Sequence, residues 1–174
     1  MTDRDHVASR PDTLNEIGVL RRREIEARIV APLIERFATE FGRELVLDLA
    51  REVVVEVART QGRALAEMVG GNDLETSAGT LSAWTQDDAL VVDVVNRTDT
   101  EYAFNVTRCR YAEMYRALGI AELGALLSCN RDGTMIEGFN ERIEFTRTQT
   151  IMGGASHCDF VYRLDPQETA VELS

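Results

Sequence analysis

The 174-residue chain contains no lysine, and all 19 of its basic residues are arginines. Without a lysine amine, Schiff-base catalysis and a P-loop lysine for nucleotide phosphates are both excluded. Arginine is instead suited to binding carboxylates, because its planar guanidinium can donate two parallel hydrogen bonds to one anion. A buried arginine is therefore the residue to look for as an anion anchor.

Positive charge is also scarce relative to negative charge, since 30 acidic residues leave a net charge of −11. Such a chain is poorly suited to bind nucleic acid or an anionic membrane. No apolar run approaches the roughly 18 residues of a membrane span, and the first residues carry no signal-peptide core. We therefore expect a cytoplasmic protein whose partner is a small molecule. A homo-oligomer is also expected as a possible state, as for many small acidic enzymes.

Familiar catalytic and metal-binding signatures are missing as well. The chain has no G-x-S-x-G, G-x-G-x-x-G, C-x-x-C or H-x-x-x-H motif. Its three cysteines, Cys109, Cys129 and Cys158, are an odd number and predict free thiols. We expect no metal or other cofactor, although zinc held by these three thiols and His157 stays an alternative.

The first 70 residues have helical periodicity. Residues 14–41 and 43–69 each repeat an apolar residue at every fourth position, which predicts two amphipathic helices paired as an antiparallel hairpin. These apolar stripes, of the kind that normally faces a core, are Ile25, Ile29, Leu33, Phe37 and Phe41, followed by Leu45, Leu49, Val53 and Val57. The basic run 21–23 lies among acids and predicts a solvated helix face.

The second half mixes strands with short helices. We predict strands at 89–95, 102–108, 142–152 and 157–164, helices at 109–118, 121–127 and 135–139, and a turn at 131–133. The resulting fold class is α+β, with an N-terminal helical hairpin packed on a small antiparallel sheet of about four strands with inserted helices. We expect a mobile tail at 1–12, a single domain at 13–165 and an acidic tail at 166–174.

Arg147 is the first candidate site residue, because it falls in an otherwise largely apolar row of a predicted strand. A buried guanidinium needs a counter-charge. Glu137, Asp132 or Asp159 could supply it within the protein, or a substrate carboxylate could do so. The spacing leaves these two interpretations open.

The run His157-Cys158-Asp159 is the second candidate. Adjacent strand residues point to opposite faces, so His157 cannot simply activate Cys158, whereas His157 and Asp159 share a face. Cys158 can equally be a small inward-facing hydrophobic residue. A further pair of carboxylates, Asp132 and Glu137, could divide general acid and base work.

Residues 105–164 resemble the L-2-amino-thiazoline-4-carboxylic acid hydrolase family. The resemblance is carried by NVTRCRYAEMYRALGIAELGALLSCNRD and by DGTMIEGFNERIEFTRTQTIMGGASHCDF. Their shared elements are a strand ending in R-C, an L-G-x-x-E-L-G helix pair, a C-x-x-D turn, R-T-Q-T and a closing C-D-F. The resemblance implies a cytosolic hydrolase that opens a small carboxylate-bearing heterocycle. The named reaction converts 2-aminothiazoline-4-carboxylate to N-carbamoyl-cysteine, and related cyclic amides or ureas are alternatives.

On that resemblance, Arg147 would hold the substrate carboxylate, with Cys129 and Asp132 completing the substrate-binding set. The ring carbon between nitrogen and sulfur would be the electrophile.

The catalytic roles drafted on the same resemblance fall to five residues. Asp159 or Glu137 would take a proton from the attacking water, and His157 would protonate the leaving atom. Alternatively, Cys109 or Cys158 attacks first and forms a covalent intermediate. A non-enzymatic domain that binds a small molecule or senses thiol state is the competing hypothesis, and its pocket should be mainly apolar.

Overall fold

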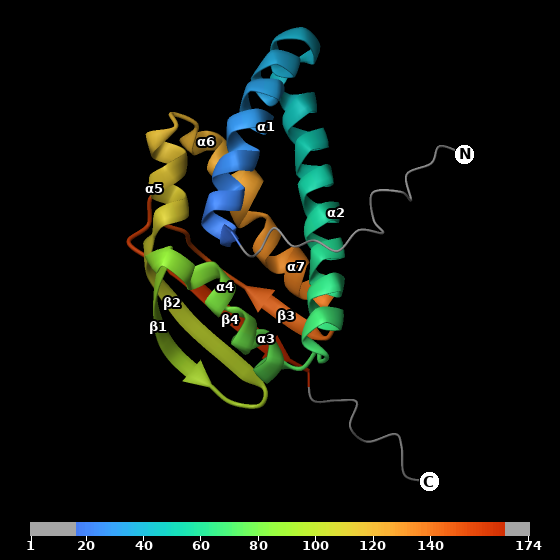
Figure 1. The fold of residues 1–174 in the computed structure, drawn as a ribbon, viewed down its shortest axis with the longest axis vertical. Coiled ribbons are helices and arrows are strands. Elements are labelled where there is room, and N and C mark those ends of the chain that lie inside the picture. Colours follow the sequence, from blue (N-terminus) through green and yellow to red (C-terminus); the bar gives the residue numbers. More distant parts are fainter. Residues whose placement is uncertain (1–16, 166–174) are drawn as a thin grey trace, which may run out of the picture.

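The computed structural model describes residues 17–165, and the tails that we predicted at 1–12 and 166–174 lie outside the described residues (Figure 1). The predicted helical hairpin is confirmed: α1 (Val19–Phe41) and α2 (Arg43–Val69) are joined at Gly42. α1 continues through Pro32 without a break. Within residues 17–165, no helix combines the length and the apolar character that a membrane span requires.

A short helical segment leads from the hairpin into the sheet. Asp73 caps the N-terminus of α3 (Leu74–Thr80), because its carboxylate accepts a hydrogen bond from the Thr76 amide at 2.7 Å. α4 (Ser82–Thr85) and the 3-10 turn η2 (Gln86–Asp88) follow. β1 (Leu90–Arg97) and β2 (Glu101–Cys109) then form the predicted antiparallel hairpin.

The helices inserted between strands differ from the prediction at one point. α5 (Arg110–Ala117) and α6 (Ala121–Gly124) lead into a single π-helical turn, η3 (Ala125–Cys129), and then into α7 (Arg131–Phe139). The predicted turn at 131–133 is wrong, because these residues form the start of α7. Gly133 serves packing there: a Cβ at this position would lie 2.8 Å from the Phe145 ring.

β3 (Ile143–Thr146) and β4 (Cys158–Leu164) complete one antiparallel sheet in the order β1-β2-β4-β3. The strand predicted at 142–152 is wrong beyond Thr146. The Asp159 carboxylate accepts hydrogen bonds from the Thr148 and Gln149 amides at 3.0 and 2.8 Å. These amides are therefore satisfied by a side chain, and residues 147–157 form a loop.

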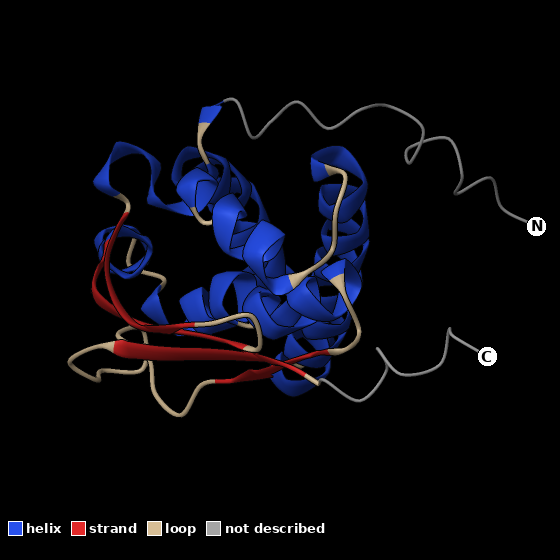
Figure 2. Ribbon diagram, turned by 90° about the horizontal axis from the view of Figure 1, so that it is seen from below, coloured by secondary structure: helices blue, strands red, loops and turns tan. Residues whose placement is uncertain are grey.

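The helices lie on one side of the sheet, which makes the fold a two-layer α+β structure (Figure 2). The helix-facing side carries a group of aromatic rings from three strands. Phe104 of β2 stacks on Phe160 of β4 at 4.9 Å between ring centroids, and Phe145 of β3 lies against Tyr162 at 5.1 Å. With Ile136 and Phe139 of α7, these rings form the core between the two layers.

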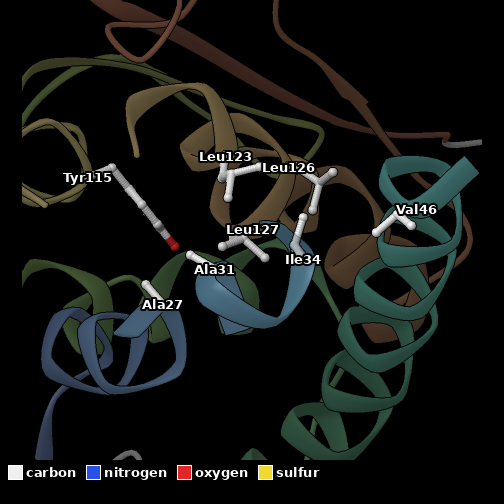
Figure 3. Close-up of a cluster of buried hydrophobic side chains, with 8 residues drawn as sticks. All are labelled: Ala27, Ala31, Ile34, Val46, Tyr115, Leu123, Leu126 and Leu127. Carbon is white, nitrogen blue, oxygen red and sulfur yellow. The ribbon is translucent and has the colours of Figure 1, made fainter. Parts of the chain in front are cut away.

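A second core joins α1 to the helices that follow β2 (Figure 3). It consists of Ala27, Ala31, Ile34, Val46, Tyr115, Leu123, Leu126 and Leu127. α1 buries its small residues here. The stripes predicted at every fourth position of α1 and α2 face away from this core, and their nine large side chains are 43–63% exposed. The expectation that these stripes face the core is therefore wrong.

α2 also packs closely on α7, and two glycines allow the contact. A Cβ at Gly62 would lie 2.0 Å from the Met135 carbonyl oxygen, and one at Gly138 would lie 2.0 Å from the Arg59 carbonyl oxygen. The two helix backbones therefore touch directly. This contact fixes the middle and the C-terminal part of α7 against α2, and the first turn of α7 lines the pocket described below.

Candidate active site

A pocket lies between the sheet and the helices, at the C-terminal end of η3 and the start of α7. Its lining comes from α1, α4, β1, β2, α5, η3, α7, β4 and the loop after β3. It is formed by Val19, Arg23, Trp84, Leu90, Val106, Cys109, Tyr111, Ser128, Cys129, Arg131, Asp132, Met135, Arg147, Met152, Cys158 and Phe160. Its cavity volume is about 70 Å³, space for roughly five water molecules. The pocket is thus sized for a small molecule.

A second cavity of about 80 Å³ adjoins the first and shares five lining residues with it: Trp84, Leu90, Asp132, Met135 and Phe160. Its remaining lining is largely apolar and includes Leu81, Phe104, Ile136 and Tyr162. Charged groups therefore converge in the first cavity, whereas Asp132 is the one charged residue among the described residues that lines the second.

All three cysteines line the first cavity, although they come from β2, η3 and β4. All are free thiols. Burial raises the pKa of Cys109 to about 11 and that of Cys129 to about 12, and it also raises the pKa of Cys158. The thiols are consequently protonated near neutral pH and lack the low pKa of an activated cysteine nucleophile.

Asp132 and Arg147 form an ion pair inside the pocket. Arg147 also donates a hydrogen bond to the Cys129 carbonyl at 3.1 Å, and its guanidinium lies over the Phe145 and Phe160 rings at 5.5 and 5.2 Å. Of the three acids that sequence offered as partners, Asp132 is the one that pairs with Arg147. Burial raises the pKa of Asp132 above its ordinary value, although Arg147 opposes this shift.

Two further arginines face the same pocket from the side where α1, α2 and α7 meet. Arg23 is buried and pairs with Glu26. Arg131 is also buried, but it donates a hydrogen bond to the neutral Gln61 amide oxygen, and none of the ion pairs among residues 17–165 involves it. Burial and the positive charge of Arg23 lower the pKa of Arg131 to about 10. A buried guanidinium with a neutral partner leaves positive charge available to an anion.

The expectation of a solvated face at residues 21–23 is wrong for Arg22 and Arg23, which are buried. Only Arg21 is exposed. The sequence offered no signal for the burial of Arg22 and Arg23. Acidic residues three or four positions away are found beside solvated arginines and beside buried ones. The tight packing of α1 through Ala27 and Ala31 draws this end of the helix into the protein.

Three residues that the sequence proposed as catalytic lie away from this cavity. Glu137 is exposed on the outer face of α7 and pairs with Arg59 at 3.0 Å. His157 hydrogen-bonds with Gln149 and Ser156. The Asp159 carboxylate caps the loop after β3. None of the three lines the pocket. β4 turns Cys158 and Phe160 toward the pocket, so their neighbours His157 and Asp159 point away from it, and Glu137 lies on the exposed side of α7.

The zinc alternative requires His157 beside the three cysteines, but this histidine does not line the cavity that they share. Among the residues that the structure describes, no group of three or more His, Cys, Asp or Glu side chains is arranged to hold a metal ion.

The fold is similar to that of several solved structures of low sequence identity. The trafficking protein particle complex subunit 3 from Naegleria fowleri, covalently bound to palmitic acid, matches with a TM-score of 0.50 and 14% identity over 83% of this chain and 95% of its own. The phenol-responsive sensory domain of the transcription activator PoxR matches with a TM-score of 0.45 and 9% identity over 84% of this chain and 72% of its own. The SO2144 H-NOX domain from Shewanella oneidensis matches with a TM-score of 0.43 and 11% identity over 86% of this chain and 99% of its own. At these identities the likeness concerns the fold alone.

No curated protein matches the sequence. The model of the family described as L-2-amino-thiazoline-4-carboxylic acid hydrolase matches residues 22–162. This range includes the charged pocket residues Arg23, Arg131, Asp132 and Arg147 and the three cysteines. Because this match spans most of the chain, the protein belongs to the L-2-amino-thiazoline-4-carboxylic acid hydrolase family.

Proposed function

We propose that the protein is a hydrolase that opens a small heterocycle carrying a carboxylate, with 2-aminothiazoline-4-carboxylate as the first substrate to test. The observation that carries this proposal is Arg131, a buried guanidinium that faces the pocket and donates a hydrogen bond to a neutral amide. The Glu26 carboxylate acts on Arg131 through space, but it is already paired with Arg22 and Arg23. Family membership supports the reaction class. Three free thiols are compatible with a reducing compartment, and we propose that the enzyme acts in the cytoplasm.

Arg131 and Arg23 are the residues that we assign to the substrate carboxylate. Both line the cavity, and their mutual repulsion would be relieved by an anion between them. Arg147, which the sequence favoured for this role, already donates to Asp132 and to the Cys129 carbonyl. We therefore assign Arg147 to positioning Asp132.

Asp132 is our candidate for the proton-transfer group. A carboxyl group with a raised pKa, held in a pocket beside a second charged group, is typical of a general acid or base. In the proposed reaction, the water oxygen bonds to the ring carbon between nitrogen and sulfur while Asp132 takes a proton from that water. The electron pair of the C=N bond moves to the nitrogen as the water adds. When this pair returns, the carbon–sulfur bond breaks and the sulfur leaves with the proton returned from Asp132. The remaining hydroxyl proton passes to the nitrogen, which leaves the carbonyl of the carbamoyl group.

Direct attack by water is favoured over a covalent cysteine intermediate, because burial keeps the thiols of Cys109 and Cys158 protonated. We expect Cys109→Ser and Cys158→Ser variants to retain turnover. Trapping of a substrate adduct on either sulfur by mass spectrometry would reverse this assignment.

The test compares two substrates and two variants. Wild type should hydrolyse 2-aminothiazoline-4-carboxylate far better than the same ring without its carboxylate. Arg131→Gln should abolish most of that preference, mainly by raising KM for the carboxylate substrate. Arg142→Gln is the matched control, because Arg142 bonds the Asp165 carbonyl outside the pocket. Equal loss in both variants would refute the role of Arg131.

A ligand-binding domain without turnover is the second candidate, favoured by the apolar second cavity. It predicts that calorimetry detects binding of the ring carboxylate while product never forms. If wild type turns over neither this substrate nor a panel of cyclic amides and ureas, the binding domain becomes the better account.

A further inference from the structure

α1 and α2 each expose a row of large apolar side chains in addition to the face that they bury, which includes Ile34 of α1 and Val46 of α2. α1 buries Ala27 and Ala31 and exposes Ile25, Ile29 and Leu33. The exposed set, which we call the hairpin face, consists of Ile25, Ile29, Leu33, Phe37, Phe41, Leu45, Leu49, Val53 and Val57. Large apolar residues normally face a core, so a helix pair that buries alanine and exposes phenylalanine indicates a further partner.

The hairpin face is large enough for a stable interface. α1 and α2 contain 23 and 27 residues and lie side by side, with their connection far from the sheet (Figure 1). Two adjacent helices of this length present a side of roughly 35 Å by 20 Å, or about 700 Å². That is close to the roughly 800 Å² that each partner buries in a standard protein–protein interface.

Charge identifies the partner. Residues 19–69 contain nine arginines and nine acidic residues, so the hairpin is neutral, whereas the whole chain carries −11. The acidic excess therefore lies entirely outside the hairpin. Two copies of this chain would repel each other through most surfaces, but they can meet at the hairpin face without net repulsion. The charges beside the apolar stripes have both signs, for example Glu24, Arg28, Arg51 and Glu52, so the face can complement itself.

The segments outside the described residues have too few large apolar side chains to cover this face. Residues 1–16 offer only Met1, Val7 and Leu14, and residues 166–174 offer only Val171 and Leu173. Nine large side chains require a similar number of partners. A second hairpin face provides that number.

We infer that the protein is a homodimer in which the α1–α2 hairpins of two copies pack face to face as a four-helix interface. Residues repeating at every fourth position form ridges along each helix, and ridges of this kind interlock when helices cross at about 50°. Phe37 and Phe41, whose rings lie 6.2 Å apart, supply an aromatic anchor near the end of the hairpin. The inference is independent of the proposed function, because no residue of the hairpin face lines the pocket.

Light scattering coupled to size-exclusion chromatography of the full chain tests the inference. Wild type should have twice the mass of one chain at micromolar concentration. Leu33→Glu and Leu49→Glu should each raise the dissociation constant at least about 100-fold, because a carboxylate would be buried at the centre of the interface. Both positions are exposed in the single chain, so these variants should keep the wild-type circular dichroism spectrum.

Val95→Glu is the matched control. Val95 is an exposed apolar residue of β1, outside the α1–α2 hairpin, and its variant should remain dimeric. A wild type that is monomeric at all concentrations would overturn the inference. So would a dimer that survives both hairpin variants but is lost in Val95→Glu, since the edge strand β1 would then be the interface. Binding of monomeric wild type to phosphatidylcholine vesicles, lost in the hairpin variants, would assign the face to a membrane instead.

Discussion

Arg147 holds Asp132 in the pocket by an ion pair that joins the loop after β3 to the start of α7. The two residues are 15 positions apart in the sequence. Arg147 also bonds the Cys129 carbonyl at the end of η3, so one side chain connects three segments of the site. The pair therefore links the stability of the protein to the protonation of its candidate catalytic carboxylate.

Breaking this pair should destabilise the protein. Arg147→Met leaves the half-buried Asp132 carboxylate without its cation, and we expect a loss of about 3 kcal/mol, the lower end for a buried ion pair. The double variant Arg147→Met/Asp132→Asn should recover much of that loss, because neither charge then remains. Urea unfolding monitored by circular dichroism measures the free energies. If the effects of the two single changes simply add in the double variant, the residues do not act as a pair.

Asp132→Asn should lower kcat by roughly 100-fold or more, the usual contribution of a general acid or base. Glu137→Gln, on the exposed side of the same helix, should leave kcat within about twofold of wild type. Steady-state kinetics of both variants with 2-aminothiazoline-4-carboxylate gives the comparison. A larger loss in Glu137→Gln would transfer the catalytic role to the residue that the sequence favoured.

The pH dependence of turnover should report the protonation of Asp132. As a base, Asp132 must be ionised, and burial raises its pKa above the ordinary 3.8 of an aspartate. We therefore expect kcat/KM to fall with decreasing pH through a pKa above 3.8. The residual activity of Asp132→Asn should lack this acidic limb. An unchanged limb in that variant would show that another group titrates.

Alkaline pH should destabilise the protein through its buried thiols. The unfolded chain releases thiol protons near pH 9.0, whereas folded Cys109 and Cys129 keep theirs to about 11 and about 12. Between these values the folded state binds more protons, so the free energy of unfolding falls as pH rises. Buried tyrosines such as Tyr115 act in the same direction. Cys129→Ala should therefore show a shallower decline than wild type between pH 9.0 and about 11 in urea titrations. Parallel curves would contradict the assignment.

The contact between α2 and α7 should not tolerate a methyl group. Gly62→Ala would place a Cβ 2.0 Å from the Met135 carbonyl oxygen, and the helices would have to separate. We expect a loss of about 3 kcal/mol or more, the upper range for overpacking. Gly79→Ala is the control: it lies in α3 with open space around it and should gain up to about 1 kcal/mol. Thermal unfolding separates the two, and similar melting temperatures for both variants would contradict the close contact.

Residue types and spacing alone predicted much of the fold. The helices predicted at 14–41 and 43–69, the strands predicted at 102–108 and 157–164, and the end of the second helix at residue 69 all match the structure to within a few residues. Local patterns succeed here because they depend on backbone geometry within a few residues. Of the eight site residues that the sequence proposed, five line one cavity, namely Cys109, Cys129, Cys158, Asp132 and Arg147, whereas Glu137, His157 and Asp159 do not. The sequence did not show that the three cysteines lie close together.

Contacts between distant segments were decided only by the tertiary structure. Asp159 ended β3 early by bonding amides ten or more positions away, and Phe145 made Gly133 a packing residue instead of a turn. The burial of Arg23 and Arg131 depends on how α1, α2 and α7 meet, which periodicity does not encode. The apolar stripes show the same limit. Their spacing determined that the α1–α2 hairpin has an apolar face, but only the packing of its alanine face into the core decided that this apolar face points outward.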